Sequence, residues 1–204
     1  MSGKFIVFEG IDGAGKSTQV ALLTERLRAL GKEVYLTAEP TSAASGKAIR
    51  EALSGNVQKS ECEMAAMFVL DRIAHSKDEI SPLTDEGKIV ISDRYYYSSL
   101  AYQGQTTSYE WVKSMNIGCP EIKRPDLCIY LDLLPEQSLA RIKARNEALE
   151  IYENIEKLTS VRNSFLAVID DLRHEGEKIF VVNANRSVEE IADEIFNTVK
   201  AELL

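Results

Sequence analysis

Short apolar runs alternate along the chain with longer segments of helical spacing. Most of these runs are unbroken, which is typical of strands that are covered on both faces of a sheet. Five strands are predicted in this way: Phe5–Glu9, Glu33–Thr37, Ile89–Ser92, Leu127–Asp132 and Lys178–Val182. The alternation of strands with helical segments favours an α/β fold built on a parallel sheet.

The segments between the strands carry apolar side chains every three or four positions. Residues 16–30 show this spacing clearly, and Gly31 stands just past their end as a stop signal. We expect a helix from 62 to 80 to end at Ser81-Pro82, and Ser187 to cap the last helix. The other expected helices cover residues 44–53, 135–145, about 149–174 and 188–204. The chain contains no repeat or low-complexity tract, so we expect one domain over residues 1–204.

Composition excludes several classes of protein. The 204 residues are 45% hydrophobic and 27% charged, as in ordinary globular domains, and no apolar run approaches the roughly 20 residues of a membrane span. A net charge of −8 argues against general nucleic-acid binding, which needs basic surface, but it allows a small phosphorylated ligand. Cys62, Cys119 and Cys128 are odd in number and lack CxxC spacing, so we expect free thiols and a cytoplasmic protein.

One motif carries specific chemistry. Gly10–Ser17 matches G-x-x-x-x-G-K-[ST] and lies between a predicted strand and a predicted helix. The glycines let successive N–H groups turn inward around phosphates, Lys16 reaches the β- and γ-phosphates, and Ser17 ligates Mg²⁺. A glycine-rich turn that matches by accident is the alternative, and the flanking strand and helix weigh against it. The candidate ATP-binding residues of this loop are Gly10, Ile11, Asp12, Gly13, Ala14, Gly15, Lys16, Ser17 and Thr18.

A phosphate-binding loop does not by itself separate kinases from GTPases and mechanical ATPases. GTPases carry a guanine-reading Asn-Lys-x-Asp after a later strand. Here the strand that ends at Asp132 continues as Leu-Leu-Pro-Glu, and the tetrad is absent. A GTPase is therefore disfavoured.

Several segments, in order along nearly the whole chain, resemble the thymidylate kinase family. They are Phe8–Gln19, Glu39-Pro40, the F-x-x-x-R helix at Phe68–His75, Asp93-Arg94-Tyr95 with Ala101–Gly104, and the run through Pro125–Asp132 into Pro135-Glu136. The resemblance implies a single-domain P-loop kinase fold with a five-stranded parallel sheet, helices on both faces and a lid at about residues 141–152. It implies transfer of the γ-phosphoryl group of ATP to dTMP, giving dTDP and ADP, with Mg²⁺ as cofactor. It also implies a homodimer built through helices packed side by side.

Two candidate residues follow the third predicted strand, where open α/β sheets bind their ligands. Asp93 can hold the Mg²⁺ shell opposite Ser17, often through water; capping of the next helix is the alternative. Arg94 can bind phosphate oxygens with its planar guanidinium and neutralise charge during transfer. The alternative is that Arg94 forms a surface salt bridge. Lys16 and Arg94 are thus catalytic candidates.

The acceptor site rests on the resemblance. It implies that Asp12 accepts a hydrogen bond from the sugar 3′-hydroxyl, although an exposed loop acid is an alternative. Phe68 and Arg72 lie four residues apart on one helix face, so the ring would stack on thymine and the guanidinium would contact a base carbonyl oxygen. Without the resemblance, Phe68 would be assigned to the core. Ser99 and Gln103 would face the polar edge of the base.

The lid assignment also rests on the resemblance. Arg141-Ile-Lys143-Ala-Arg145 resembles the Arg-x-Arg-x-Arg lid of the family group in which the P-loop position of Gly13 is Gly rather than Arg. Arg141 would stack on adenine, and Lys143 and Arg145 would reach the phosphates as catalytic cations. A solvated cationic helix face is the alternative. The middle Lys cannot reproduce a guanidinium fork, so its role stays open.

The chain departs from the family pattern at two further places. Ala38 stands where bacterial relatives often have Arg, so a contact to the monophosphate must come from elsewhere, with Arg50 and Lys47 as possibilities. Ile151 replaces an Arg of the other family group, and the neighbouring Tyr152 either contacts the sugar or base of dTMP or simply packs.

Two other functions remain open at this stage. The alternative that differs least is phosphoryl transfer from ATP to another nucleoside monophosphate or to a deoxynucleoside. The other is a nucleotide-dependent switch or regulatory ATPase without a small-molecule product. His75 and His174 are isolated and make no case for a metal site or a catalytic triad, so we expect structural or surface roles.

Overall fold

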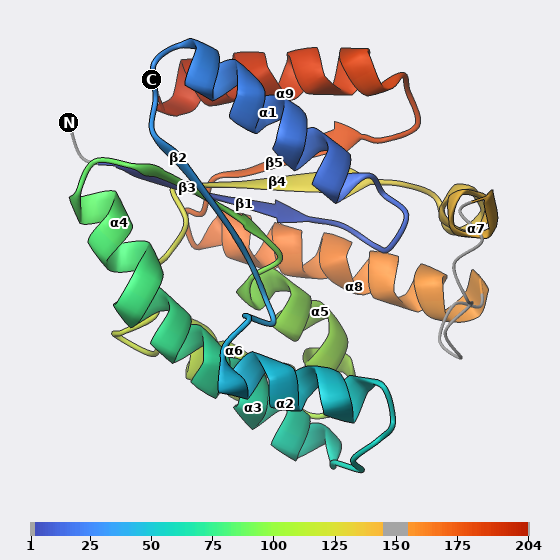
Figure 1. The fold of residues 1–204 in the computed structure, drawn as a ribbon. Coiled ribbons are helices and arrows are strands. Elements are labelled where there is room, and N and C mark those ends of the chain that lie inside the picture. The colour runs from blue at the N-terminus through green and yellow to red at the C-terminus, as the bar shows by residue number, and fades with distance from the viewer. Residues whose placement is uncertain (1–2, 145–154, 204) are drawn as a thin grey trace.

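The computed structural model describes residues 3–144 and 155–203, which form a five-stranded sheet with helices around it (Figure 1). All strand pairs are parallel, and the strands lie in the order β2-β3-β1-β4-β5. The strands are β1 Lys4–Glu9, β2 Val34–Ala38, β3 Ile89–Asp93, β4 Leu127–Asp132 and β5 Ile179–Asn183. The predicted fold class is confirmed, and every predicted strand is present within one residue of its predicted ends.

The central strand explains why its sequence is an unbroken apolar run. Phe5 and Val7 of β1 point into one hydrophobic cluster, and Ile6 and Phe8 point into the other. All four side chains are fully buried. Because successive residues of a strand face opposite sides of the sheet, a strand covered on both sides needs apolar residues at every position.

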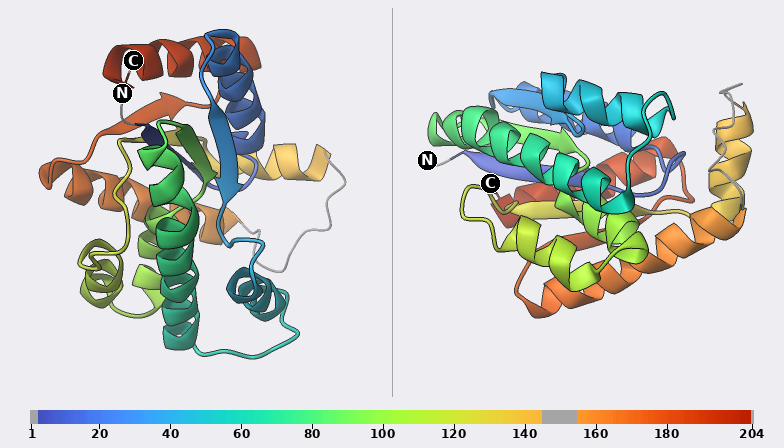
Figure 2. Two further views of the ribbon diagram at one scale, coloured as in Figure 1. Left: turned by 60° about the vertical axis from the view of Figure 1, so that its left-hand side comes forward. Right: turned by 90° about the horizontal axis from the view of Figure 1, so that it is seen from below.

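Helices cover both faces of the sheet, as Figures 1 and 2 show: α1 and α9 lie over one face, and α5 and α8 lie over the other. Further helices, α2, α3 and α6, lie together beyond the α5 side. The bounds are α1 Lys16–Ala29, α2 Ala44–Leu53, α3 Glu61–His75, α4 Ser81–Asp85, α5 Tyr96–Thr106, α6 Tyr109–Ile117, α7 Pro135–Ala144, α8 Ile155–His174 and α9 Val188–Leu203.

Two of the predicted helix signals are confirmed. Gly31 adopts a positive φ of 75° just beyond the end of α1. The Ser187 hydroxyl accepts a hydrogen bond from the Glu190 N–H at 3.3 Å, and Glu190 accepts one in return from the Ser187 N–H at 3.0 Å. This reciprocal pair caps α9.

The predicted helix end at Ser81-Pro82 is wrong. Helix α3 passes into a π-helical turn at Ser76–Ile80 and then directly into α4, in whose first turn Pro82 lies. Proline is tolerated there because the first N–H groups of a helix need no partner within the helix.

Helices α5 and α6 were not predicted from the sequence. The N-cap residue of α5, Tyr95, makes no side-chain hydrogen bond to the helix within the described structure, so the usual local start signal is missing. The acceptors for its first N–H groups come from a residue far away in the chain, Glu9.

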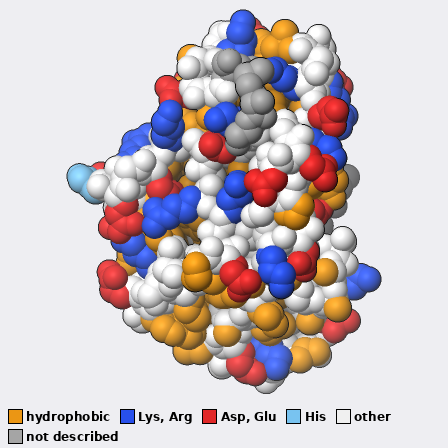
Figure 3. Space-filling model, turned by 90° about the vertical axis from the view of Figure 1, so that its left-hand side faces the viewer, with side chains coloured by type: hydrophobic (Ala, Val, Ile, Leu, Met, Phe, Trp, Pro, Cys, Tyr) orange, Lys and Arg blue, Asp and Glu red, His pale blue; other side chains and the backbone are white. Residues whose placement is uncertain are grey.

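One side of α3 is exposed and apolar. Leu70 is 63% exposed, and Cys62, Ala66 and Ala74, at four-residue spacing around it, are exposed as well. Figure 3 shows hydrophobic side chains gathered over the end of the molecule at which α2 and α3 lie. Among residues 3–144 and 155–203, the structure contains no helix that is long and apolar enough to cross a membrane.

Candidate active site

The loop Gly10–Ser17 joins β1 to α1 at the carboxyl edge of the sheet, and its backbone requires glycine. Gly10 has a φ of 146° and Gly13 a φ of 75°, conformations that other residues rarely adopt. A Cβ atom at Gly10 would lie 2.8 Å from the Leu131 carbonyl oxygen, and one at Gly13 would lie 2.9 Å from the Ser138 carbonyl oxygen. The loop is therefore held closely between the end of β4 and α7.

Lys16 lies in the mouth of this loop. Its side chain is largely buried, and Nζ donates to the carbonyl oxygens of Gly10 at 2.9 Å and Ile11 at 3.4 Å. Burial, together with the charge of Arg94, lowers the pKa of Lys16 to about 8. Phosphate oxygens next to the ammonium group would stabilise its charged form, because an opposite charge favours ionisation.

Ser17 and Asp93 face each other across the loop. The Ser17 hydroxyl lies 3.4 Å from Asp93 Oδ2, and Asp93 Oδ1 is buried without a hydrogen-bond partner in the described structure. Asp93 is not the cap of α5, whose N-cap is Tyr95. Among the described residues, no group of three or more His, Cys, Asp and Glu side chains could hold a metal. The hydroxyl of Ser17 and the carboxylate of Asp93 fit Mg²⁺, which commonly takes one or two protein oxygens and completes its shell with phosphates and water.

Arg94 follows β3 in a left-handed conformation, with a φ of 72°. Nη2 lies 2.5 Å from Asp12 Oδ1, and Nη1 donates to the Ser98 hydroxyl at 3.1 Å. Burial opposes the ionisation of Asp12, but the charges of Arg94 and Lys16 outweigh it and lower the pKa of Asp12. A non-glycine residue in this backbone region is uncommon and is often found at functional sites. The contact with Asp12 connects the β3 loop to the phosphate-binding loop.

Arg72 is buried and almost saturated with hydrogen bonds. Its Nε and Nη2 bind Glu39 Oε2 at 2.8 and 2.6 Å. Its Nη1 donates to the Ser99 hydroxyl at 3.1 Å and to Asn116 Oδ1. A guanidinium has five N–H groups, so within the described structure these contacts leave one, on Nη2, for another acceptor. One carbonyl oxygen of a base would complete the set.

Phe68 lies one helical turn before Arg72 and is half-buried. Neither hydrophobic cluster of the described residues includes it. This position does not support the alternative interpretation, in which Phe68 is a core residue. Gln103, on α5 one turn after Ser99, is half-buried as well.

The first turn of α5 joins these two groups of residues. Ser98 contacts Arg94, which faces the phosphate-binding loop, and its neighbour Ser99 contacts Arg72. A single rigid helix start therefore fixes the spacing between the two arginines. A nucleoside monophosphate, with a phosphate at one end and a base at the other, has the form that such a pair of subsites would bind.

Helix α7 lies against the phosphate-binding loop from the opposite side. Arg141 Nη2 donates to the Ala184 carbonyl at 2.8 Å, and Nη1 lies 3.4 Å from the Gly13 carbonyl oxygen and 3.5 Å from that of Ala14. The base of the predicted lid is thus anchored beside the loop that would hold ATP.

Comparison with known proteins identifies the family. A model described as thymidylate kinase matches residues 8–195. The chain is 42% identical over 211 residues to a probable thymidylate kinase of Pyrococcus abyssi, covering 100% of this chain and 99% of that protein. It is 36% identical over 200 residues to a thymidylate kinase of Leptospira interrogans, covering 97% of this chain and 96% of that protein. The chain belongs to the thymidylate kinase family. It is accordingly an ATP-dependent nucleoside monophosphate kinase.

Most of the lid that the thymidylate kinase resemblance implies, residues 145–152, lies outside the described residues. Lys143 is exposed near the end of α7. Arg145 and Tyr152 lie outside the described residues, so their roles stay predictions. Ile151, which replaces an arginine of the other family group, also lies outside the described residues.

Arg50 and Lys47 were the two candidates to replace the family arginine that is missing at Ala38. Both residues are exposed, and Arg50 donates to the carbonyl oxygens of Thr41 at 2.7 Å and Pro40 at 2.5 Å. Arg50 is therefore the candidate that the fold brings to the segment after β2.

Two buried polar residues of this thymidylate kinase site were not predicted from the sequence. Glu9 is fully buried, and burial raises the pKa of its carboxyl above the ordinary value in spite of the Arg94 charge nearby. Asn116 binds Arg72 from α6, a helix that we did not predict from the sequence. For Glu9 the sequence did contain a signal, since it is an acid directly after the unbroken apolar run Phe5–Phe8.

The two histidines differ. His75 is buried, with Nδ1 at 2.9 Å from Glu39 Oε1 and Nε2 at 2.7 Å from the Thr37 hydroxyl. His174 lies on the surface, with its side chain 77% exposed. His75 therefore binds one carboxylate oxygen of Glu39, and Arg72 binds the other.

Proposed function

We propose that the chain, a kinase that transfers the γ-phosphoryl group of ATP to dTMP, binds the ATP phosphates over Gly10–Ser17 and dTMP between α3 and α5. The observation that carries this arrangement is the contact of Asp12 with Arg94, at 2.5 Å between Oδ1 and Nη2. It brings the phosphate-binding loop and the β3 loop together at the carboxyl edge of the sheet, where donor and acceptor phosphates would have to meet.

The proposed mechanism needs no general base, because the acceptor oxygen of dTMP is already anionic. Catalysis then consists of alignment and charge stabilisation. Lys16 would bind the β- and γ-phosphate oxygens of ATP, and Arg94 would bind the dTMP phosphate and the transferring group. Arg50 would add a cation on the dTMP phosphate side.

Ser17 and Asp93 would hold Mg²⁺. Asp93 Oδ1, which is buried and has no hydrogen-bond partner among the described residues, would be an acceptor for a metal-bound water. When bound, Mg²⁺ supplies positive charge to the β- and γ-phosphate oxygens. The side chains themselves fix where that charge sits relative to Lys16 and Arg94.

The thymine base would stack on Phe68 and accept a hydrogen bond from the remaining N–H of Arg72. Ser99 and Gln103 would line the polar edge of the base, although the Ser99 hydroxyl is already an acceptor for Arg72. Asp12 would accept a hydrogen bond from the sugar 3′-hydroxyl, and Tyr152 would contact the sugar or base. Because Arg72 offers only a donor, a base with an oxygen at the contacted position is favoured over one with an amino group.

The lid would complete the ATP site. Arg141 would stack on adenine, and Lys143 and Arg145 would reach the transferring phosphoryl group. Closure over the nucleotides would exclude water and suppress ATP hydrolysis.

We also infer a homodimer, formed through the exposed apolar side of α3 centred on Leu70. A contiguous apolar stripe on a helix is an expected contact surface for a second copy of the same helix. The three cysteines are free thiols, which supports a reducing compartment and hence the cytoplasm.

A coupled assay of ADP formation tests the function. The purified chain, with ATP and Mg²⁺, is offered dTMP, dUMP, dCMP, dGMP and thymidine in parallel. We expect the highest kcat/KM for dTMP. Preference for another monophosphate would change the substrate assignment, and ATP hydrolysis that is indifferent to every acceptor would support a switch or regulatory ATPase instead.

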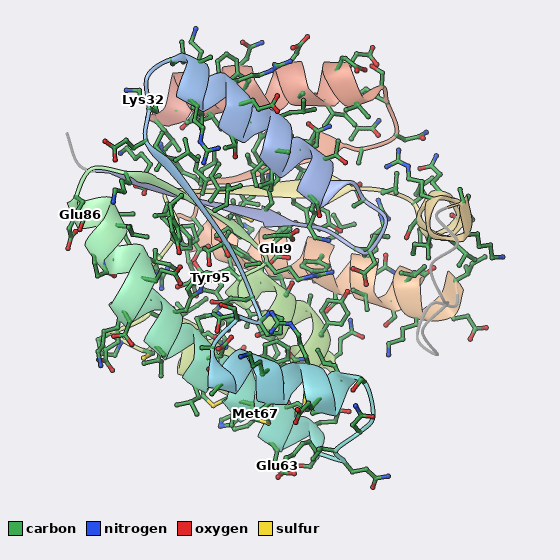
Figure 4. The ribbon with its side chains drawn as sticks, in the orientation of Figure 1. Glu9, Lys32, Glu63, Met67, Glu86 and Tyr95 are labelled. Atoms are coloured by element: carbon green, nitrogen blue, oxygen red, sulfur yellow. The ribbon has the colours of Figure 1, made fainter. Side chains whose placement is uncertain are left out.

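Lys16→Ala provides the catalytic control for that assay. It should lower kcat by about 10²–10³, the usual loss for a single charge-stabilising contact. Lys32→Ala is the matched control, because Lys32 lies beyond the opposite end of α1 (Figure 4), and it should leave kcat unchanged. A folded Lys16→Ala variant with near-normal turnover would contradict the role of Lys16.

A further inference from the structure

We propose that Glu9 is a positioning residue for phosphoryl transfer, which acts by holding the loop that carries Arg94. The inference rests on the proposed function, because it assumes that Arg94 contacts the phosphates. Glu9 itself would touch neither substrate.

Glu9 is the last residue of β1 and its side chain is fully buried. Oε1 accepts hydrogen bonds from the backbone N–H groups of Tyr95 at 2.9 Å and Ser98 at 3.1 Å. Oε2 accepts one from the Ser98 hydroxyl at 2.7 Å. Figure 4 shows Glu9 and Tyr95 in the interior of the molecule, between the sheet and α5. All three donors belong to the segment directly after Arg94.

These hydrogen bonds supply the N-terminal cap of α5. The first N–H groups of a helix have no partner within the helix, and the N-cap residue Tyr95 makes no side-chain cap within the described structure. A carboxylate also suits the positive end of the helix dipole. Glu9 therefore fixes where α5 starts, and with it the position of Arg94 one residue before the N-cap.

The same carboxylate acts on the guanidinium through Ser98. The Ser98 hydroxyl has one proton, which it donates to Glu9 Oε2, so only its lone pairs remain for Arg94 Nη1 at 3.1 Å. Glu9 thus keeps the Ser98 hydroxyl proton turned away from the guanidinium, so that a lone pair faces Nη1 while Nη2 contacts Asp12.

The backbone of Arg94 needs this support. Its φ of 72° is unfavourable for a residue with a Cβ atom, and such conformations persist only where the surroundings fix them. The Arg94 N–H donates to the carbonyl oxygen of Phe8 at 2.9 Å, and the Ser92 hydroxyl donates to the Arg94 carbonyl oxygen at 2.7 Å. Phe8 and Glu9, adjacent on β1, therefore hold the loop through its backbone on both sides of the Arg94 side chain.

Glu9→Gln is the informative substitution because it keeps the size of the side chain and reverses one hydrogen bond. With the amide oxygen facing the two backbone N–H groups, the amide NH₂ faces Ser98 and donates to its hydroxyl. The hydroxyl proton must then turn away from residue 9, toward a guanidinium that can only donate. We expect kcat to fall roughly 10- to 100-fold, the range for losing a hydrogen bond to a charged group. The KM for ATP should stay within about twofold, because Lys16 and the phosphate-binding loop are unchanged.

Glu177→Gln is the matched control. Glu177 has a largely buried side chain, and it accepts hydrogen bonds from the hydroxyls of Tyr96 at 2.7 Å and Tyr97 at 2.6 Å in the first turn of the same helix. It contacts the start of α5 through residues other than Ser98, the residue that contacts Arg94. If both substitutions lower thermal stability but only Glu9→Gln lowers kcat, a purely structural role is excluded. Equal loss of kcat in the two variants would overturn the proposal.

A double-mutant cycle decides whether Glu9 acts through Arg94. In the Arg94→Ala background, Glu9→Gln should cause no further loss of kcat, because the group that it positions is gone. The same fold loss in both backgrounds would show that Glu9 acts independently and would overturn the proposal. Should Arg94→Ala alone retain wild-type kcat, the proposed role of Arg94 fails, which is a separate result. If the Glu9→Gln protein does not fold, Ser98→Ala can be used instead, because it interrupts the same contact. Ser98→Ala should lower kcat in the wild-type background but not in the Arg94→Ala background. An unchanged kcat in the wild-type background would overturn the proposal.

Discussion

Arg72 and Glu39 form an ion pair that is buried on both sides, with 2.6 Å between Nη2 and Oε2 and side chains that are 1% and 2% exposed. Loss of one partner would leave the other as a buried charge without this ion pair, which is far more costly than the loss of a surface pair. This residue pair therefore links stability to the base contact that we propose for Arg72.

Arg72→Ala should destabilise the protein by about 3–5 kcal/mol, the usual cost of breaking a buried ion pair. Urea unfolding at neutral pH measures it. Arg124→Ala is the control, since Arg124 is exposed and lies 3.4 Å from Glu177, and its removal should cost less than about 1 kcal/mol. Similar losses for the two variants would show that Arg72 is not held by its buried partner.

Phe68→Ala should weaken dTMP binding without a comparable loss of stability, because Phe68 is half-buried and lies outside the hydrophobic clusters of the described residues. The expected loss is about 1–3 kcal/mol of binding free energy, as for other bases stacked on aromatic rings. The KM for ATP should not change. Equal rises in both KM values, or a large drop in unfolding free energy, would place Phe68 in the core instead.

Whether a structural feature could be predicted from the sequence depends on how far apart in the chain the residues that determine it lie. The strands were predictable because burial on both faces leaves a local mark, an apolar residue at every position. The phosphate-binding loop was predictable because its spacing is local too. Helix α5 was not, because its cap comes from Glu9, more than 80 residues earlier in the chain.

The site likewise combines features that are determined locally with features that depend on residues far apart in the chain. The spacing of Phe68 and Arg72 indicated one helix face correctly, but no local pattern shows which partners hold Arg72. Glu39 lies 33 residues before it and Asn116 lies 44 residues after it. Pro82 misled for a related reason, since its effect depends on whether it falls in a helix interior or in a first turn.

The capping box at the start of α3 gives a pH-dependent prediction. The Ser60 N–H donates to Glu63 Oε2 at 2.8 Å, and Lys59 Nζ lies 2.9 Å from Glu63 Oε1. These hydrogen bonds lower the pKa of Glu63 from 4.5 to about 2. Its contribution to stability is thus complete above pH 4.5 and is lost as the pH falls toward 2.

Glu63→Ala should therefore unfold at lower urea concentration than the wild type at pH 7, and the gap should narrow as the pH falls below about 4.5. Glu63→Gln is the control, because Gln can still accept the Ser60 N–H but carries no charge. A gap between wild type and Glu63→Ala that is the same at pH 7 and pH 3 would contradict the lowered pKa.

Leu70→Glu should convert the proposed homodimer into monomers, because it places a charge in the middle of the apolar stripe on α3. Sedimentation velocity measures the change. Leu30→Glu is the control: Leu30 is 50% exposed, but it lies at the end of α1. A wild-type protein that sediments as a monomer would contradict the dimer, and a dimeric Leu70→Glu variant would move the interface elsewhere.

The lid prediction assigns different roles to Arg141, Lys143 and Arg145, and single substitutions can distinguish these roles. Arg141 is anchored to the carbonyl oxygens of Ala184, Gly13 and Ala14, and it is expected to stack on adenine. Arg141→Ala should therefore raise the Kd for ATP even in the absence of dTMP, through the lost stacking on the base. Isothermal titration with a non-hydrolysable ATP analogue measures this directly.

Arg145→Ala should behave in the opposite way. Because Gly13 provides no cation in the phosphate-binding loop, charge on the transferring group must be met by Lys16, Arg94, Mg²⁺ and the lid. A supplied arginine contributes about 10³–10⁵ to phosphoryl transfer in other enzymes, and the loss here should be smaller because several cations share the task. The Kd for ATP without dTMP should hardly change. If Lys143→Ala removes turnover and Arg145→Ala does not, the two roles are exchanged. If neither substitution affects turnover, the cationic stretch is a solvated helix face, and the transfer depends on the cations of the loop and β3 alone.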